Sequence, residues 1–265
     1  MPLLDLLVLC LIFFCTSVIS VVTGATSLIT VPTLLAFGLP TTTALGTNML
    51  ALTVMSVGAS VPFWQGDALD RPRLPLLIAL TVIGSLLGAL LVFAVPSGWL
   101  PLIIAAAMLV VAGVVLRPRH TVTTAAASPP SPPRLALGYG LTLLLAVYGG
   151  FFSGGYVTLL TAAFLAAFRL PFLKAVATTK VINVASSLVA TVIFASRGAV
   201  DWPLGGLLSA VMYVGATLGA RWTLRLDERW IRRLFVTTVL VLAVKTLMLD
   251  VPWARLMTGW GPGPG

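Results

Sequence analysis

Long uninterrupted apolar runs constrain this chain more than any other feature. Four of them, each about 20 residues long, are Leu3–Val22, Leu74–Val95, Trp99–Leu116 and Trp230–Leu249. A helix of that length crosses a bilayer, and the alternating ten-residue strands of a membrane barrel are not visible. With 59% apolar and 9% charged residues, the composition also excludes a soluble globular domain. We therefore predict an all-α, polytopic integral membrane protein.

Composition also narrows the partners. The net charge of +9 would suggest nucleic acid in a soluble protein, but here most Lys and Arg lie in loops, where they report membrane topology. We therefore expect the lipid bilayer as a partner and no nucleic acid. His120 is the only histidine, and Cys10 and Cys15 share one apolar run, so we expect no metal site and no cofactor. The first run has acidic Asp5 where a signal peptide would be basic, so we interpret it as a retained helix.

The second part of the chain repeats the first at a constant offset, the one that separates Gly24 from Gly155. Gly, Pro, Asp and Trp recur in one register over a long stretch, which indicates an internal duplication. The matched pairs are Gly24 and Gly155, Phe37 and Phe168, Pro40 and Pro171, Ala44 and Ala175, Thr47 and Thr178, Asp70 and Asp201, Pro72 and Pro203, Gly84 and Gly215, Gly88 and Gly219, and Trp99 and Trp230.

The duplication predicts a domain organisation. We expect a first membrane repeat at 1–116, a Pro/Ser-rich cytoplasmic linker at 117–134, a second membrane repeat at 135–250 and an external tail at 251–265. Within the first repeat, Gly24 and the Leu39-Pro40 step break the apolar pattern. The expected segments there are Leu3–Val22, Leu28–Phe37, Thr43–Trp64, Leu74–Val95 and Trp99–Leu116, with a polar loop at Gln65–Arg73.

Loop charge predicts how the two repeats are oriented. Suppose that the first segment of each half enters the membrane and the second returns the chain to the same side. Each half then has an odd number of crossings, and the repeats are inverted. One side then carries 12 of the 14 loop Lys and Arg residues, and the other only Arg197 and Arg255. Parallel repeats would divide them evenly. The positive-inside rule therefore favours inverted repeats, with both termini external.

Two helix breaks at matched positions are the candidate binding site. The first is Gly24–Ser27, with Ala25 and Thr26, and the second is Gly154, Gly155, Tyr156 and Thr158. Broken helices at matched positions of two repeats are typical of secondary transporters. Each break starts a new helix, whose free N–H groups and partial positive charge suit a small anion. The alternative is that these glycines only allow helices to pack closely.

A polar cluster follows each break. The first half contributes Thr47 and Asn48, whereas the second contributes Thr178, Thr179, Lys180 and Asn183. A lysine inside a membrane helix needs a partner or a role. Every Asp and Glu lies in a loop or near a segment end, so an anionic substrate is an attractive partner for Lys180. The alternative is that Lys180 reaches out to the cytoplasmic surface.

The same lack of acids limits the coupling mechanism. Proton-linked carriers commonly use an Asp, Glu or His within the membrane, and no such residue stands in the middle of an apolar segment here. Protons remain open as the coupling ion only if they travel on the substrate or on Lys180, and facilitated diffusion is equally open.

Several motifs resemble those of one transporter family, the sulfite exporter TauE/SafE family, also called the 4-toluene sulfonate uptake permeases. The resemblance covers about Val22 to Leu249, and its motifs occur in the family's order in both halves. Lys180 is not part of the family pattern, and the first break is poorer in glycine than usual. The motifs are Thr30–Pro40, Ala44–Asn48, Gly66–Asp70, Gly84 with Gly88, Ala175–Thr179, Gly198–Trp202 and Gly215–Arg221.

The resemblance implies transport of sulfite, sulfonates or related sulfur-containing organic anions across the cytoplasmic membrane. We therefore expect an alternating-access secondary carrier for a small anion such as sulfite, an organosulfonate or sulfoacetate. The alternatives are a carrier of another small organic anion and a non-transporting accessory or assembly protein. An enzyme is not expected, because no acid or histidine lies at depth. Export or uptake, the exact anion and the oligomeric state stay open.

Overall fold

A computed structural model describes residues 3–64, 68–100, 102–104, 106–107 and 130–225. These residues form helices and connecting turns, with no β-strand among them, as the hydropathy pattern predicts. The linker up to residue 129, most of the predicted Trp99–Leu116 segment, the Trp230–Leu249 segment and the tail at 251–265 lie outside the described residues.

Helix boundaries in the first half lie close to the predicted ones, because glycine and proline interrupt the apolar runs there. The predicted Leu28–Phe37 segment is the helix Ser27–Ala36, and the predicted Leu74–Val95 segment is Leu74–Ala94. The elements are α1 (Leu3–Thr23), α2 (Ser27–Ala36), α3 (Thr41–Trp64), α4 (Leu74–Ala94) and the 3₁₀ turn η1 (Ser97–Trp99).

The second half follows the same order. Its first helix begins at Pro132, within the stretch predicted as linker, because proline suits the first turn of a helix. The elements are α6 (Pro132–Phe151), α7 (Tyr156–Ala163) with its π-helical extension η2 (Phe164–Phe168), α8 (Phe172–Ser196) and α9 (Trp202–Arg225).

In the described part of the chain, six helices are long and apolar enough to cross a membrane: α1, α3, α4, α6, α8 and α9. Their outward faces carry large apolar side chains, such as Ile83, Leu87 and Leu91 on α4, each about half exposed. A surface of this kind is suited to lipid rather than water. The protein is therefore a multi-pass membrane protein.

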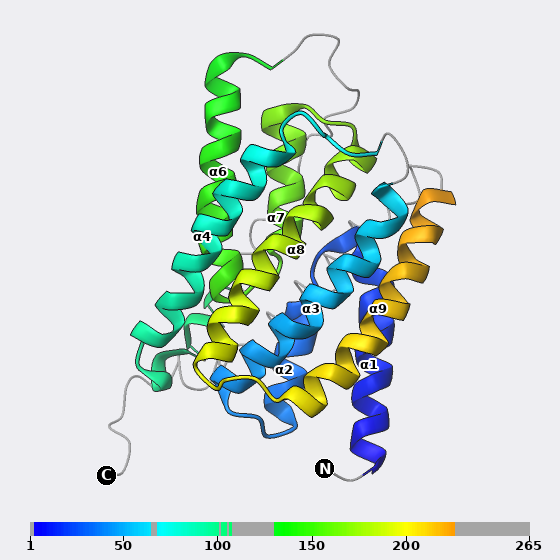
Figure 1. Cartoon of the computed structure of the whole chain (residues 1–265), viewed down its shortest axis with the longest axis vertical. Helices are drawn as coiled ribbons and strands as arrows, with labels where there is room; N and C mark the ends of the chain where they lie inside the picture. Colours follow the sequence, from blue (N-terminus) through cyan, green and yellow to red (C-terminus); the bar gives the residue numbers. More distant parts are fainter. Residues whose placement is uncertain (1–2, 65–67, 101, 105, 108–129, 226–265) are drawn as a thin grey trace, which may run out of the picture.

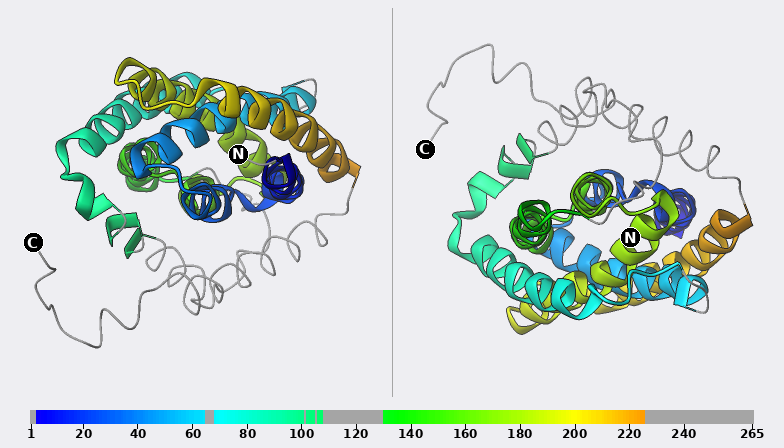
Figure 2. Two further views of the ribbon diagram at one scale, coloured as in Figure 1. Left: turned by 90° about the horizontal axis from the view of Figure 1, so that it is seen from below. Right: turned by 90° about the horizontal axis from the view of Figure 1, so that it is seen from above.

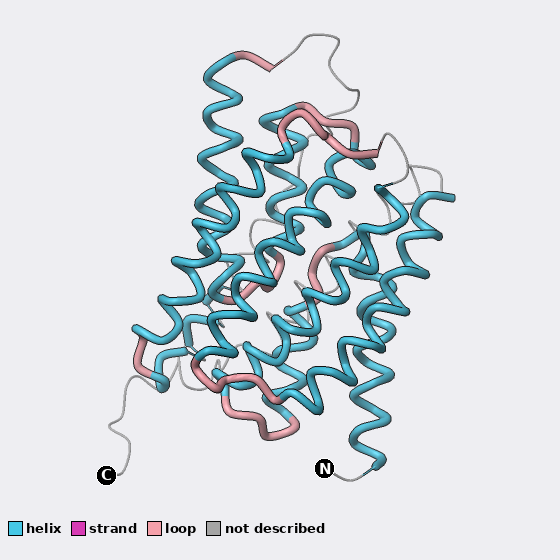
Figure 3. The backbone as a smooth tube through the Cα atoms, viewed as in Figure 1, coloured by secondary structure: helices cyan, strands magenta, loops and turns pink. Residues whose placement is uncertain are grey.

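Two helical hairpins enter the molecule from opposite ends. The pair α1–α2 (the first hairpin) starts at the lower end in Figure 1, and the pair α6–α7 (the second hairpin) starts at the upper end. Figure 3 shows both turning points near the middle of the long axis. Helix α2 has only 10 residues, or about 15 Å, which is half the thickness of the hydrocarbon core. Both hairpins thus turn inside the helical body and not at its ends.

The remaining helices form a layer against which the hairpins pack (Figure 2). Within it, α3 and α8 are the most buried of the long helices, and α3 packs on both α8 and α9. Their buried faces are rich in small and polar residues, including Thr47, Asn48, Thr178 and Asn183. Polar side chains that water would normally solvate are therefore buried inside the protein.

Glycines allow the outer helices to pack closely. A Cβ at Gly88 on α4 would lie 1.9 Å from the carbonyl oxygen of Val147 on α6. A Cβ at the matched Gly219 on α9 would lie 2.4 Å from the carbonyl oxygen of Val18 on α1. Small residues at matched positions thus bring each hairpin against a helix of the other half, as in other membrane helix pairs.

Candidate functional site

The tips of the two hairpins touch. Gly24 and Gly155 both adopt left-handed backbone conformations, with φ of 68° and 75°, which glycine reaches without steric cost. A Cβ at Gly24 would lie 2.8 Å from the backbone nitrogen of Thr158. A Cβ at Gly154 would lie 2.9 Å from Cδ2 of Leu28. The two breaks, which occupy matched positions in the sequence, are thus in direct contact.

Two helix N-termini start at this contact. Helix α2 begins at Ser27 and α7 at Tyr156. The first N–H groups of a helix have no acceptor within it. Those of Thr26, Ser27 and Thr158 donate to no backbone carbonyl in the described part of the chain. Two partial positive charges with available donors therefore lie side by side at the hairpin tips.

Lys180 brings a basic side chain to the same region. It lies on α8, its side chain is 1% exposed, and its Nζ donates a hydrogen bond of 2.7 Å to the carbonyl oxygen of Ser20. Ser20 is in the last turn of α1, where the helix dipole favours a cation. Lys180 therefore points inward to the first hairpin and does not reach out to the membrane surface.

Thr158 makes a second contact between the halves at the end of α1. Its hydroxyl donates to the carbonyl oxygen of Thr23, the last residue of α1. The end of α1 is thus held by two side chains of the second half, one from α7 and one from α8. Movement of either half at the tips must break or exchange these bonds.

Asn48 fixes the start of α2. Its Nδ2 donates to Oγ of Ser27 at 2.9 Å, and its Oδ1 accepts from Oγ1 of Thr30 at 2.6 Å. The matched residues of the second half repeat part of this arrangement, because the hydroxyls of Thr161 and Thr179 lie 3.1 Å apart. Each central helix is therefore bonded to the short helix of its own hairpin.

The other predicted residues near the tips have separate partners. Nδ2 of Asn183 donates to Oγ of Ser56 on α3 at 2.6 Å, whereas its Oδ1 has no partner among the described residues. The Tyr156 hydroxyl lies beside those of Thr81 and Ser186 but makes no hydrogen bond of good geometry. Thr26 donates to the sulfur of Met55 at 3.8 Å. The second half therefore keeps two buried polar atoms available for a further partner.

Thr47 and Thr178 do not belong to the tips. The hydroxyl of Thr178 accepts a 3.0 Å hydrogen bond from the N–H of Asp70, just before α4. The hydroxyl of Thr47 accepts one of the same length from the N–H of Asp201, just before α9. These loops lie at opposite ends of the molecule in Figure 1. The two threonines therefore tie loops to helices of the other half.

The sequence analysis did not predict several residues that form hydrogen bonds with the site residues. Ser20 and Thr23 contribute only backbone carbonyls, which no side-chain pattern reveals. Asp70 lies in a predicted loop, yet its side chain is only 6% exposed. Thr30 and Thr161 had a usable signal, because they are threonines at matched positions of the two halves, in the same register as the two breaks.

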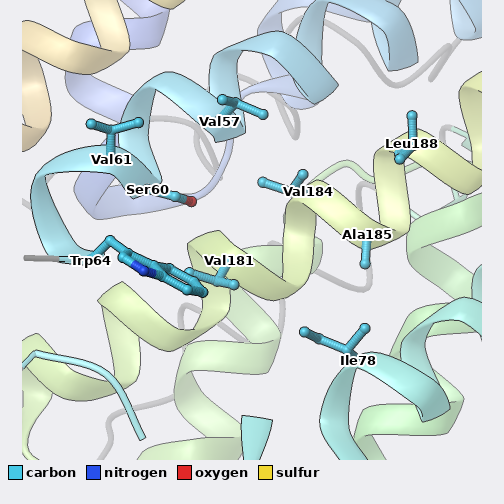
Figure 4. A pocket seen from close by; sticks show the side chains of 9 residues that line it. All are labelled: Val57, Ser60, Val61, Trp64, Ile78, Val181, Val184, Ala185 and Leu188. Carbon is cyan, nitrogen blue, oxygen red and sulfur yellow. The ribbon is translucent and has the colours of Figure 1, made fainter. Parts of the chain in front are cut away.

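Two cavities flank this region. One, of about 300 Å³, lies along the first hairpin and includes Ser20, Thr23 and Ile29 in its lining. The other, of about 390 Å³, lies between α3, α4 and α8 and is open and almost entirely apolar (Figure 4). The one hydroxyl in its lining, from Ser60, donates to the carbonyl oxygen of Ser56. The other polar side-chain atom of its lining is the indole nitrogen of Trp64, so this second cavity offers an anion little polar contact.

Comparison with known proteins agrees with this architecture. The model of the family described as "Sulfite exporter TauE/SafE" matches residues 9–246. A "Probable membrane transporter protein" of Haemophilus influenzae is 30% identical over 260 residues, covering 94% of this chain and 97% of that protein. A "Probable membrane transporter protein ORF9" of Sinorhizobium is 28% identical, covering 88% of this chain and 89% of that one.

A third relative, the "Probable membrane transporter protein YfcA" of Escherichia coli K12, is 28% identical and covers 85% of this chain and 83% of its own length. No solved structure matches the chain. The family model spans nearly the whole membrane region, including both hairpins and the central helices. The chain therefore belongs to the sulfite exporter TauE/SafE family of membrane transporters.

Proposed function

We propose that this protein is a secondary carrier for a small sulfur-containing anion, such as sulfite or an organosulfonate, and that the anion binds at the hairpin tips. One observation carries the proposal: the N-termini of α2 and α7 meet at Gly24 and Thr158, beside the buried Lys180. Among the described residues, Lys180 and Asp70 are the only charged residues that are buried. Asp70 is engaged with Arg73 at one end of the molecule.

The electrostatics of the tips favour an anion. Two helix N-termini and an ammonium group repel one another, and this repulsion falls if a negative charge lies between them. Lys180 now donates to a neutral carbonyl, whereas a sulfonate or sulfite oxygen would add the attraction of a negative charge to the hydrogen bond. The Ser20 carbonyl would still accept from the N–H of Gly24, at 2.9 Å. Substrate can thus exchange with the carbonyl without leaving that oxygen unpaired.

The proposed site includes only part of the predicted set. Residues Gly24–Ser27 with Gly154, Gly155, Tyr156 and Thr158 supply backbone donors, hydroxyls and the space that the glycines leave. Lys180 supplies the charge. Asn48, Thr179 and Asn183 orient these groups from α3 and α8. Thr47 and Thr178 act at a distance, through the loops that they hold.

We also propose that the two halves are inverted repeats that alternate in access. Matched contacts support this: α1 packs on α9 as α6 packs on α4, and the Thr–Asp bonds are reciprocal. Arg73, Arg134, Arg169, Lys174 and Arg225 stand at helix ends that share the upper side of Figure 1, whereas Arg197 ends α8 on the lower side. By the positive-inside rule, the upper side is cytoplasmic in the inner membrane, and the N-terminus is external.

The sulfur chemistry of the substrate comes from the family description, whereas the site itself indicates only a small anion. A thermal-shift panel of sulfite, thiosulfate, taurine, sulfoacetate and aromatic sulfonates tests whether the protein binds a small anion and whether that anion contains sulfur. A ligand that binds the folded state raises its melting temperature. We expect at least one of these anions to do so, and to be taken up saturably by proteoliposomes.

The matched control is Arg134→Gln, which removes an exposed cation at the start of α6. It should keep both the thermal shift and the flux, whereas Lys180→Ala should lose both. A panel without any shift, or equal flux in Lys180→Ala and wild type, would remove the anion site from the hairpin tips. A non-transporting accessory role would then be the better description.

A further inference from the structure

Two loops tie the halves together at opposite ends of the molecule. The loop before α4 belongs to the first half and bonds through the N–H of Asp70 to Thr178 in the second half. The loop before α9 belongs to the second half and bonds through the N–H of Asp201 to Thr47 in the first half. Both N–H to hydroxyl distances are 3.0 Å. An opening between the halves at either end must break the bond at that end.

The loop contacts at the two ends differ in the interactions that reinforce them. At the Asp70 end, a guanidinium nitrogen of Arg73 lies 2.7 Å from the Asp70 carboxylate. The same guanidinium lies 5.3 Å from the ring centre of Phe168, which belongs to the second half. One cation thus bridges its own loop to the opposite hairpin, by an ion pair on one side and a cation–π contact on the other.

The Asp201 end lacks that bridge. Leu204 stands at the position matched to Arg73, and the Asp201 carboxylate instead accepts from the Leu204 N–H at 3.1 Å, as a cap of α9. Arg197 lies 5.6 Å from the ring centre of Phe93. Between residues within the described ranges, however, the Asp70–Arg73 pair is the only ion pair. Among those residues, the Asp201 end therefore has a cation–π contact without an ion pair.

We propose that these two loop contacts are the gates of the carrier, and that Arg73 latches the Asp70 gate so that the resting protein opens first at the Asp201 end. This inference rests on the proposed transport function. Arg73 and Phe168 act as positioning residues, because they lie at the end of the molecule and not at the hairpin tips. Thr47 and Thr178 are then gate residues, whose hydroxyls hold the loops.

Cysteine labelling tests the latch without any substrate. Leu69 and Val200 are matched residues next to the two aspartates, 2% and 8% exposed. Each is replaced by cysteine in a chain whose native Cys10 and Cys15 are changed to serine. The rate of modification by a water-soluble maleimide is then measured in open membrane fragments, where both faces of the protein are accessible to the reagent.

We expect Arg73→Gln to speed labelling at position 69 about five-fold, because an ion pair and a cation–π contact are lost together. Labelling at position 200 should stay the same or slow down. Arg73→Lys keeps the ion pair but not the planar stacking, and should give an intermediate rate at position 69. The control is Arg71→Gln in the same loop, since the Arg71 side chain bonds only to the Trp64 carbonyl among described groups.

Unchanged labelling at position 69 in Arg73→Gln would overturn the latch, as would an equal increase at both positions, which indicates general loosening. If Arg73→Gln does not fold, the same criterion applies to Arg73→Lys against wild type. Because the assay needs no anion, its outcome is independent of the substrate panel. If no anion of the panel shifts the melting temperature but Arg73→Gln still speeds labelling at position 69 alone, the anion site is contradicted and the proposed gates are still supported.

Discussion

The two hairpin tips share a backbone but differ in their side chains. Gly24 and Gly155 have the same left-handed conformation, and Gly38 and Arg169, which are also matched in sequence, share another, with φ of 86° and 55°. The side chains that face the tips do not match. The first half has Ala25, Met49, Leu52 and Met55 where the second has Tyr156, Lys180, Asn183 and Ser186.

This difference distinguishes the residues that set the path of the chain from those that can hold an anion. Features that set the path of the chain, namely the breaks, the close-packing glycines and the loop-holding threonines, recur in both halves. The groups that can hold a charge are concentrated in the second half. The first half contributes the end of α1 and the start of α2, which are backbone groups. An anion should therefore be held mainly by side chains of the second half and by main-chain donors of both.

The largest effect on anion binding is expected when the second half is given the side chain of the first half at Lys180. Lys180→Met introduces the residue found at the matched position 49. We expect anion affinity to fall about 10- to 100-fold, because a charge-assisted hydrogen bond is lost. The protein should stay folded, since the Ser20 carbonyl keeps its bond from Gly24. Isothermal titration with the anion found by thermal shift measures the effect.

The control for that change is Met49→Leu, a swap of similar volume at the matched buried position. Its affinity should remain within about two-fold of wild type. Equal losses in the two variants would mean that the halves contribute alike, which contradicts the asymmetry.

The shared backbone can be tested at the tip contact. Gly24→Ala places a Cβ 2.7 Å from Cβ of Val157 in a left-handed conformation. We expect the free energy of unfolding to fall by roughly 3 kcal/mol, from backbone strain and overpacking together. Gly38→Ala has the same backbone penalty, with φ of 86°, but nothing within 4 Å, so it should cost only about 1 kcal/mol. Thermal melts in detergent compare the two, and equal shifts would show that the tips do not press together.

A smaller effect is expected where Asn48 clamps α2. Asn48→Thr introduces the residue of the second half at the matched position 179. It removes the bonds to Ser27 and Thr30, which should lower the free energy of unfolding by about 1–2 kcal/mol. Combined with Ser27→Ala, the losses should be less than additive, because both changes remove the same bond. Full additivity in a double-mutant cycle would argue against the clamp.

Sequence reasoning could predict most of the path of the chain. Apolar runs, Gly24 and Pro40 placed the helix ends of the first half close to where they lie, and the repeat alone paired Gly155 with Gly24. The partners of the site residues were not predictable. The Lys180 partner is a backbone carbonyl, and every residue has one, so only tertiary placement selects Ser20.

Thr47 and Thr178 illustrate the same limit. A threonine next to Asn48 or close to Lys180 in sequence looks like part of the same polar cluster. Adjacent residues on a helix point about 100° apart, however, and residues two apart about 200°, because a turn takes 3.6 residues. Thr178 therefore faces the Asp70 loop while Lys180 faces the first hairpin. The sequence predicted that α3 and α8 carry polar residues. It did not predict which of these residues contact the hairpins and which contact the loops.

The smallest change in stability is expected at Tyr156. Its hydroxyl is buried without a hydrogen bond of good geometry, so Tyr156→Phe should change the free energy of unfolding by no more than about 0.5 kcal/mol. If the hydroxyl binds the anion, the dissociation constant should rise about five-fold. A loss of stability with unchanged affinity would assign the hydroxyl to Thr81 and Ser186 instead.

The most direct test of the central claim is a structure with bound anion. The brominated form of the sulfonate that gives the largest thermal shift locates the ligand by anomalous scattering. The account predicts sulfonate oxygens against the N–H groups of Ser27 and Thr158 and against Nζ of Lys180, which leaves the Ser20 carbonyl. A sulfonate bound elsewhere, with Lys180 still donating to Ser20, would contradict it.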